Sequence, residues 1–248
     1  MIEFGLGLIG IGKPWGFAHP EVPSEAQAME LLERAVELGV RYFDTAPSYG
    51  VSEERLGRFL ATAGRSGVRI ATKFGEYWDA ERGEPFVDHS YEALARSLDG
   101  SLARLGRIDF LQLHKTTPQA LASDEVARAF EYARSLGIAE IGASVSDLES
   151  ARITVANPAF GLIQLPYNAA QEMFAATIDA AVARGMRVAV NRPFGMGKML
   201  YEESPISKVE AFRFILRKRF EGVILSGTKS AAHLEENLRA FEEAGGAG

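Results

Sequence analysis

A recurring pattern constrains the fold of this chain more than any other feature: an amphipathic helical segment, a glycine, a short apolar run and then a polar residue. It occurs in "LGVRYFDT", "SGVRIATK", "LGRIDFLQLH", "LGIAEIGAS", "RGMRVAVNR" and "EGVILSGT". Glycine just after a helix commonly adopts the left-handed conformation that ends the helix, because it has no Cβ to clash there. The six glycines are Gly39, Gly67, Gly106, Gly137, Gly185 and Gly222. The pattern predicts helices and strands that alternate along the chain.

The predicted helices carry start signals and apolar faces. Ser24 with Gln27, and Ser146 with Glu149, fit the capping box. Apolar residues recur at helical spacing, as in Ala28, Leu31, Leu32, Ala35 and Leu38, or in Leu94, Leu98, Leu102 and Leu105. Predicted strands such as 108–113 and 223–225 are nearly continuous apolar runs, which is typical of strands covered on both faces.

Two more segments complete the alternation. "ANPAFGLIQLPYN" repeats the pattern with Asn157 and Pro158 in place of the glycine, and "FGLGLIG" supplies a first strand. Eight strands alternating with eight helices imply right-handed βαβ units and a parallel sheet. We therefore expect an α/β fold, a (β/α)8 TIM barrel, as a single domain over residues 1–248. A doubly wound open sheet is the alternative, although it usually has fewer strands.

A dinucleotide fingerprint is not expected at the N-terminus. Residues 5–10, "GLGLIG", match G-x-G-x-x-G, which binds dinucleotides only between a strand and a helix. The following "IGKPWGFAHPEVP" contains three prolines, so we expect a loop there rather than a helix.

Composition and charge exclude several classes of function. The chain has no cysteine, which excludes disulfides, thiol nucleophiles and thiolate metal sites. A net charge of −6 argues against general affinity for nucleic acid or anionic membranes. No apolar run approaches membrane-spanning length, and the acidic Glu3 does not fit a signal peptide. We expect a cytoplasmic protein without a metal site, a membrane partner or a nucleic-acid partner.

Polar residues end most of the predicted strands, where barrels of this kind place their active sites. They are Asp44, Lys73, His114, Ser144, Gln164, Asn191, Arg192 and the run from Ser226 to Lys229. An acid, a lysine and a histidine on three consecutive strands predict one site, with Tyr49 above it on the second loop. The other histidines, His19, His89 and His233, are expected to face solvent.

These side chains have a shared chemical use. Tyrosine titrates near pH ~10 in water, and a nearby ammonium lowers that pKa. Asp44 can hold Lys73 charged and in place, and His114 can orient a substrate oxygen. The result is a general acid that protonates a carbonyl oxygen as a hydride arrives at its carbon. The alternative is a structural Asp44–Lys73 ion pair, with Tyr49 and His114 merely packed nearby.

A second cluster, "ILSGTKSAAHLEENL" at residues 224–238, ends a strand and opens a helix. Backbone N–H groups at a helix start, together with a lysine, suit a phosphate. The alternative is a simple helix cap by Thr228 or Ser230.

Together these segments resemble the aldo-keto reductases. "FDTAPSYG" is similar to the family's Asp-Thr-Ala-x-x-Tyr-Gly segment, and "ATK" and "LQLH" supply its lysine and histidine. The resemblance implies an NADPH-dependent barrel oxidoreductase that reduces small-molecule aldehydes or ketones to alcohols. It implies that Asp44, Tyr49, Lys73 and His114 are catalytic, with Tyr49 as the acid.

The resemblance also implies a cofactor site. "IGAS" and "IQLPYN" imply that Ser144 and Gln164 hold the nicotinamide carboxamide. "SGTKSAAHLEEN" implies phosphate contacts from Gly227, Thr228, Lys229 and Ser230, and adenine contacts from Glu236 and Asn237. Ser226, Asn191 and Arg192 complete the predicted cofactor set, and Trp15 is predicted to line the substrate pocket.

Some positions depart from the family pattern. Val145 replaces an asparagine, Asn191 and Arg192 stand where an aromatic residue usually stacks, and Lys229 or His233 replaces an arginine. A guanidinium grips a 2′-phosphate best, so NADH stays possible beside NADPH. Short loops predict an open site, and the natural substrate and oligomeric state are not specified.

Two other functions are compatible with this barrel mouth. One is a nicotinamide-binding protein with a regulatory or partner-binding role and vestigial catalysis. The other is aldolase-like use of Lys73, which is disfavoured because the acid beside Lys73 keeps it protonated.

Overall fold

Eight parallel strands close into a barrel in the computed structural model, which describes residues 1–16, 21–63, 67–79, 81–200 and 206–246. Their order is β1-β10-β9-β8-β7-β6-β3-β2, and β1 pairs with both β10 and β2. The strands are β1 (Ile2–Gly7), β2 (Tyr42–Asp44), β3 (Arg69–Phe74), β6 (Phe110–Leu113), β7 (Glu140–Ser144), β8 (Leu162–Pro166), β9 (Arg187–Asn191) and β10 (Gly222–Gly227). The (β/α)8 prediction is confirmed, and closure excludes the open sheet.

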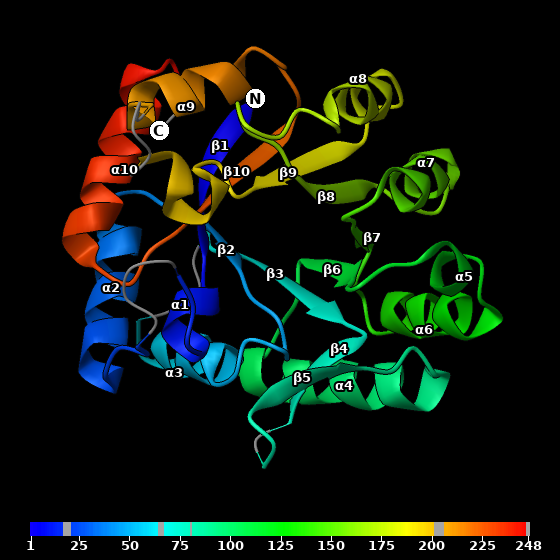
Figure 1. Ribbon diagram of the computed structural model, residues 1–248. Helices are drawn as coiled ribbons and strands as arrows, with labels where there is room; N and C mark the ends of the chain where they lie inside the picture. Colours follow the sequence, from blue (N-terminus) through cyan, green and yellow to red (C-terminus); the bar gives the residue numbers. More distant parts are fainter. Residues whose placement is uncertain (17–20, 64–66, 80, 201–205, 247–248) are drawn as a thin grey trace.

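Helices surround the barrel on its outside (Figure 1). Those that follow its strands are α2 (Glu25–Glu37), α3 (Ser52–Ala63), α4 (Tyr91–Leu105), α6 (Asp124–Ser135), α7 (Leu148–Ala156), α8 (Ala175–Ala183), α9 (Lys208–Leu216) and α10 (Ala231–Glu243). Within the described residues, no helix is both long enough and apolar enough to cross a membrane.

Local signals place most of these elements correctly. All six glycines of the repeated pattern have positive φ angles, and the predicted capping box of Ser24 and Gln27 starts α2. The predicted box at Ser146 is wrong. Asp147 caps α7 instead, because its carboxylate accepts a hydrogen bond of 2.8 Å from the Ser150 N–H.

Five elements of the described residues are additions to the predicted alternation. A two-stranded hairpin, β4 (Glu76–Asp79) and β5 (Glu84–Val87), follows β3 at the carboxyl end of the barrel (Figure 1). Single helical turns form α1 (Ile9–Gly12) and α5 (Pro118–Leu121). The 3-10 segment η1 (Gly195–Leu200) is interrupted at Met196 and Gly197, which have positive φ angles. The expectation of a loop directly after the first strand is therefore wrong at α1, which ends just before Pro14.

The buried apolar residues form two layers. The larger cluster fills the space between the strands and the outer helices, and includes Leu31 of α2 and Leu98 of α4. The smaller cluster lies inside the barrel and contains Tyr42, Ala71, Phe110, Leu162, Ala189, Val223 and Leu225. These side chains fill the barrel near its amino end, and the mouth formed by the carboxyl ends holds the site described below.

Candidate active site

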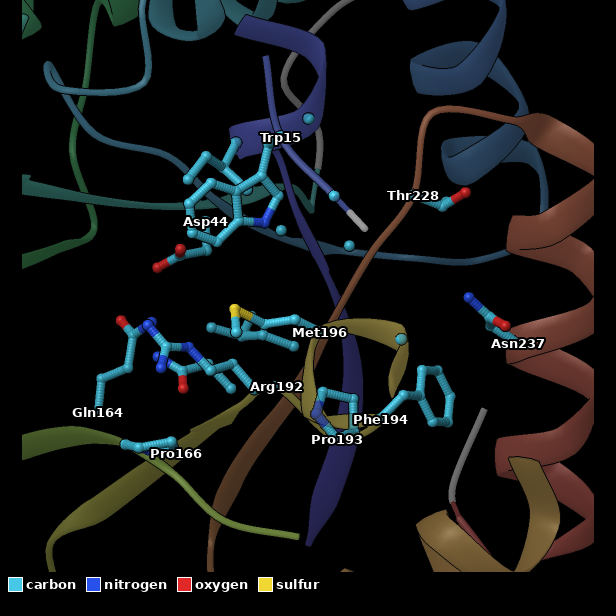
Figure 2. Close-up of a pocket in the computed structure, with 18 of the residues that line it drawn as sticks. Trp15, Asp44, Gln164, Pro166, Arg192, Pro193, Phe194, Met196, Thr228 and Asn237 are labelled. Carbon is cyan, nitrogen blue, oxygen red and sulfur yellow. The ribbon is translucent and has the colours of Figure 1, made fainter. Parts of the chain in front are cut away.

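A cavity of about 1100 Å³ opens at the carboxyl ends of the strands. The predicted site residues that line it are Asp44, Tyr49, His114, Ser144, Gln164, Asn191, Arg192, Gly227, Thr228, Lys229, Glu236, Asn237 and Trp15. Figure 2 shows Trp15, Asp44 and Gln164 on one side of the cavity, and Thr228 and Asn237 on the other. The structure therefore brings together residues from strand ends that are far apart in the sequence.

Asp44 and Lys73 form a buried ion pair on neighbouring strands. Lys73 Nζ donates to both carboxylate oxygens of Asp44, at 2.8 and 2.7 Å, and to the carbonyl oxygen of Thr45 at 3.0 Å. These three bonds use all the donors of an ammonium group. Burial alone would lower the pKa of Lys73, but Asp44 and Tyr49 outweigh it and raise the pKa. Lys73 therefore stays charged, behind the residues that line the cavity.

Tyr49 is held over this pair by a close approach of two backbones. The Val51 N–H donates to the Gly12 carbonyl oxygen at 3.1 Å. A Cβ on Gly12 would lie 1.7 Å from the Tyr49 carbonyl oxygen, so only glycine fits there. The Lys73 ammonium lies 5.0 Å from the centre of the Tyr49 ring. The glycine-rich start of the chain thus shapes the loop that carries Tyr49.

The pKa of Tyr49 is raised, whereas the sequence predicts that it is lowered. Burial raises the pKa of Tyr49 and Asp44 adds to this effect, while Lys73 opposes it. The desolvation of the phenolate outweighs the attraction of the ammonium, which Asp44 already neutralises. Tyr49 is therefore protonated at neutral pH, as a proton donor must be.

His114 faces the carboxylate of Glu76, which is not among the site residues predicted from the sequence. Its Nδ1 lies 3.0 Å from Glu76 Oε2, and both side chains are largely buried. Burial lowers the pKa of His114 well below its usual range, and Lys73 and Lys115 add to this effect. Nδ1 also lies 3.4 Å from the Ser48 hydroxyl, which can donate or accept a hydrogen bond. A proton on Nδ1 would face the Glu76 carboxylate and would leave Nε2 as an acceptor. Glu76 could have been found from the sequence only by its position, because it is an acid three residues after Lys73. It begins the hairpin that was not predicted.

His89 supports the same segment, so the expectation that it faces solvent is wrong. Its Nε2 lies 2.9 Å from the carbonyl oxygen of His114, and the side chain is partly buried. His233 is exposed and lines the cavity, and His19 lies outside the described residues. Among the described residues, no three His, Asp or Glu side chains are grouped as a metal site requires.

The nicotinamide end of the predicted cofactor site offers unpaired acceptors. Gln164 Oε1 and Asn191 Oδ1 are buried and have no hydrogen-bond partner among the described residues. Both side chains line the cavity, together with Ser144. Buried polar atoms are almost always hydrogen-bonded in proteins, so these oxygens fit a ligand that brings N–H donors. A carboxamide is such a ligand.

The opposite end of the cavity meets the start of α10. Gly227, Thr228 and Lys229 line it, and Lys229 Nζ donates to the carbonyl oxygen of Glu21 at 2.7 Å. Glu236 forms an ion pair of 2.7 Å with Lys208, which also lines the cavity. Backbone N–H groups at the start of α10, with Lys229 beside them, fit an anionic group.

Two predicted cofactor residues do not line the cavity. The buried Ser226 hydroxyl accepts a hydrogen bond of 3.1 Å from Asn237 Nδ2. The Ser230 side chain accepts from the His233 N–H and caps α10, as the alternative at that position expected. Contacts of either serine with a cofactor stay predictions.

Several lining residues were absent from the sequence prediction. They are Gly10, Lys13, Glu76, Pro85, Lys115, Pro193, Phe194, Met196 and Lys208, among others. Most lie in loops or in the hairpin, where no periodic pattern assigns a direction to a side chain.

Known proteins resemble this chain along most of its length. The sequence pattern of the Aldo/keto reductase family matches residues 3–210. Aldo-keto reductase str7 from Strobilurus tenacellus is 26% identical, over 96% of this chain and 83% of the relative. Aldo-keto reductase yakc from Schizosaccharomyces pombe, whose name specifies NADP(+), is 34% identical over 44% of this chain and 32% of its own. The solved structure of PA4992 from Pseudomonas aeruginosa superimposes with a TM-score of 0.83 at 25% identity, over 97% of this chain and 89% of that one.

Proposed function

This chain belongs to the aldo/keto reductase family, and on that premise we propose that it reduces aldehyde or ketone carbonyls to alcohols with NAD(P)H. The observation that carries the proposal is the grouping of Tyr49, His114 and the Asp44–Lys73 pair at one wall of the cavity. The same cavity extends to the start of α10, so it has room for a dinucleotide beside a small substrate.

Tyr49 is the proton donor in this proposal. When bound, the cofactor supplies the hydride that reaches the carbonyl carbon. The Tyr49 hydroxyl gives its proton to the carbonyl oxygen, and the resulting phenolate is stabilised by the nearby Lys73 ammonium. The raised pKa of Tyr49 keeps its hydroxyl protonated at neutral pH.

His114 has a different role from that of Tyr49. We propose that His114 carries its proton on Nδ1, facing Glu76, so that its Nε2 accepts a hydrogen bond rather than donating one to the carbonyl. It can therefore orient a hydroxyl group of the substrate or of the alcohol product. Glu76 acts through His114, as a positioning residue that fixes the imidazole.

The cofactor would lie across the cavity from Gln164 to α10. The unpaired oxygens of Gln164 and Asn191 fit the carboxamide N–H groups, and Ser144 lies at the same end. Thr228, Lys229 and the backbone at the start of α10 suit the phosphates. The name of the yakc relative favours NADPH for this chain, with NADH as the second cofactor to test.

The aldolase-like alternative loses support from this geometry. To form a Schiff base, a lysine must be neutral and accessible to the substrate carbonyl. The Lys73 ammonium instead donates all three of its hydrogen bonds to Asp44 and Thr45. Lys73 is also fully buried.

A cofactor titration followed by a turnover assay tests the proposal. Quenching of protein fluorescence should report saturable binding of NADPH or NADH, and the bound cofactor should be oxidised when a reactive aldehyde is added. Tight cofactor binding without oxidation across a panel of aldehydes and ketones would favour the regulatory barrel instead. Absence of binding to both cofactors would overturn both functions.

A further inference from the structure

Lys13 is a cation on the cavity wall that the proposed chemistry does not use. It directly follows α1, and its ammonium lies 5.0 Å from the centre of the Trp78 ring and 5.9 Å from that of Tyr49. Both aromatic faces attract a cation and hold it in place. In the described part of the chain, no carboxylate forms an ion pair with Lys13. Lys13 therefore places a cation that has no ion-pair partner among the described residues beside the proposed proton donor.

The nearest acidic group is already engaged. Glu76 lies 3.0 Å from His114 Nδ1 through one oxygen and 3.3 Å from Lys115 Nζ through the other. The Glu76 carboxylate is thus shared by His114 and Lys115, and no ion pair between it and Lys13 is seen in the described residues. Burial lowers the pKa of Lys13, Lys115 lowers it further, and Glu76 opposes them. A partly desolvated ammonium in such surroundings gains most from a second anion.

Lys115 lines the cavity near Glu76, as Lys13 does. It follows His114 directly and has a φ of 51°, a left-handed conformation that is uncommon for a residue other than glycine. Its side chain is more exposed than that of Lys13, and both lysines line the cavity with Tyr49 and His114. The two lysines therefore border the same cavity as the proposed proton donor, and Lys13 Nζ lies 5.9 Å from the centre of the Tyr49 ring.

Resting on the proposed function, we propose that the carbonyl compounds reduced here carry an acidic group, a carboxylate or a phosphate, which Lys13 binds with help from Lys115. The acid would lie on the side of the cavity formed by α1 and the hairpin, and the carbonyl would lie at Tyr49. Arg192 and the lysines near α10 lie with the predicted cofactor contacts and are not part of this subsite.

A structural role for Lys13 makes a different prediction. If Lys13 only ties Trp78 of β4 to the Tyr49 loop, its removal disturbs the reduction of every substrate to the same extent. If it binds an acid, its removal affects acidic substrates alone. Matched pairs of compounds that differ by the acidic group separate these roles.

The kinetic experiment compares 4-carboxybenzaldehyde with benzaldehyde, and glyceraldehyde 3-phosphate with glyceraldehyde. Wild-type protein with NADPH should show a kcat/KM at least about tenfold higher for the acidic member of one pair, and the preferred pair identifies the acid. Lys13→Met should lower that value about tenfold through KM and leave the neutral compound within about twofold. Lys115→Met should have a smaller effect, because Glu76 already pairs with Lys115. Lys198→Met, at an exposed lysine outside the cavity, is the matched control.

A binding experiment decides the inference even if no carbonyl is turned over. Calorimetry with the NADPH-loaded protein compares 4-(hydroxymethyl)benzoate with benzyl alcohol. We expect the acid to bind at least about tenfold more tightly, and we expect Lys13→Met, but not Lys198→Met, to remove the difference. Equal binding of the two alcohols, or an equal loss for both aldehydes in Lys13→Met, would overturn the inference. Absence of turnover with retained, Lys13-dependent binding would overturn the reductase function alone.

Discussion

Tyr49 and His114 titrate outside the neutral range for the same physical reason, which is that both lie where water is largely excluded. Burial raises the pKa of an acid such as Tyr49, because its charged form is the phenolate. Burial lowers the pKa of His114, because its charged form is the imidazolium. Each side chain is therefore neutral when the substrate arrives.

A flat pH profile follows from these opposite shifts. Tyr49 loses its proton only as the pH rises through its raised pKa, and His114 gains one only as the pH falls through its lowered pKa. We predict that kcat/KM for aldehyde reduction is constant between about pH 7 and about pH 9 at saturating cofactor. Steady-state rates across that range check this. A descending limb centred within the range would show that Tyr49 is not shifted upward.

The contact with Glu76 predicts the tautomer of His114. With its Nδ1 3.0 Å from the carboxylate, the ring should carry its proton on Nδ1 at neutral pH. Long-range proton–nitrogen NMR spectra of the protein distinguish the two ring nitrogens, and Glu76→Gln should perturb the signals of His114 but not those of His233. A proton on Nε2 with a bare Nδ1 in wild-type protein would contradict the assigned role.

Among the elements, α3 and α4 are joined to β3 by one buried acid. Glu53 of α3 accepts hydrogen bonds from Ser101 and Arg104 of α4, at 3.1 Å and 2.7 Å respectively, and from Thr72 of β3 at 2.5 Å. Lys73 belongs to β3, and the loop that carries Tyr49 leads into α3. The network therefore stabilises the wall of the barrel on which the proposed site rests.

Removing the cation from this network should be costly. Arg104→Met would leave the Glu53 carboxylate buried without a counter-charge, which costs about 3 kcal/mol. Arg58→Met is the matched control, because the pair of Arg58 with Glu25 is exposed and such pairs contribute less than ~1 kcal/mol. Urea unfolding measures both free energies. Similar losses in the two variants would show that the network contributes little.

The sequence predicts the elements with strong periodicity and misses those without it. The apolar face of α2 and the run of β6 follow from residue spacing, because burial on one face or on both faces leaves a repeat in the sequence. The hairpin has no such repeat, since all of β5 is exposed. Glu76 was missed with it. Asp147 was missed at α7 because Ser146 offered an equally good cap one residue earlier.

For the whole molecule, barrel closure explains why the strand-end residues could be assigned to one site. Parallel strands put their carboxyl ends at one mouth, so Asp44, Gln164 and Asn191 line the same cavity. The orientation of individual side chains could not be predicted. Ser226 turns toward Asn237, and the raised pKa of Tyr49 reflects burial that only the assembled barrel produces.

The proposed carbonyl reduction depends on Tyr49 as the proton donor. The most direct test measures NADPH oxidation with a reactive aldehyde in wild-type protein and in Tyr49→Phe, after both are shown to bind NADPH equally. We predict turnover in the wild type and a rate at least about a hundredfold lower in the variant, because general acid catalysis contributes that much. An undiminished rate in Tyr49→Phe would contradict the claim.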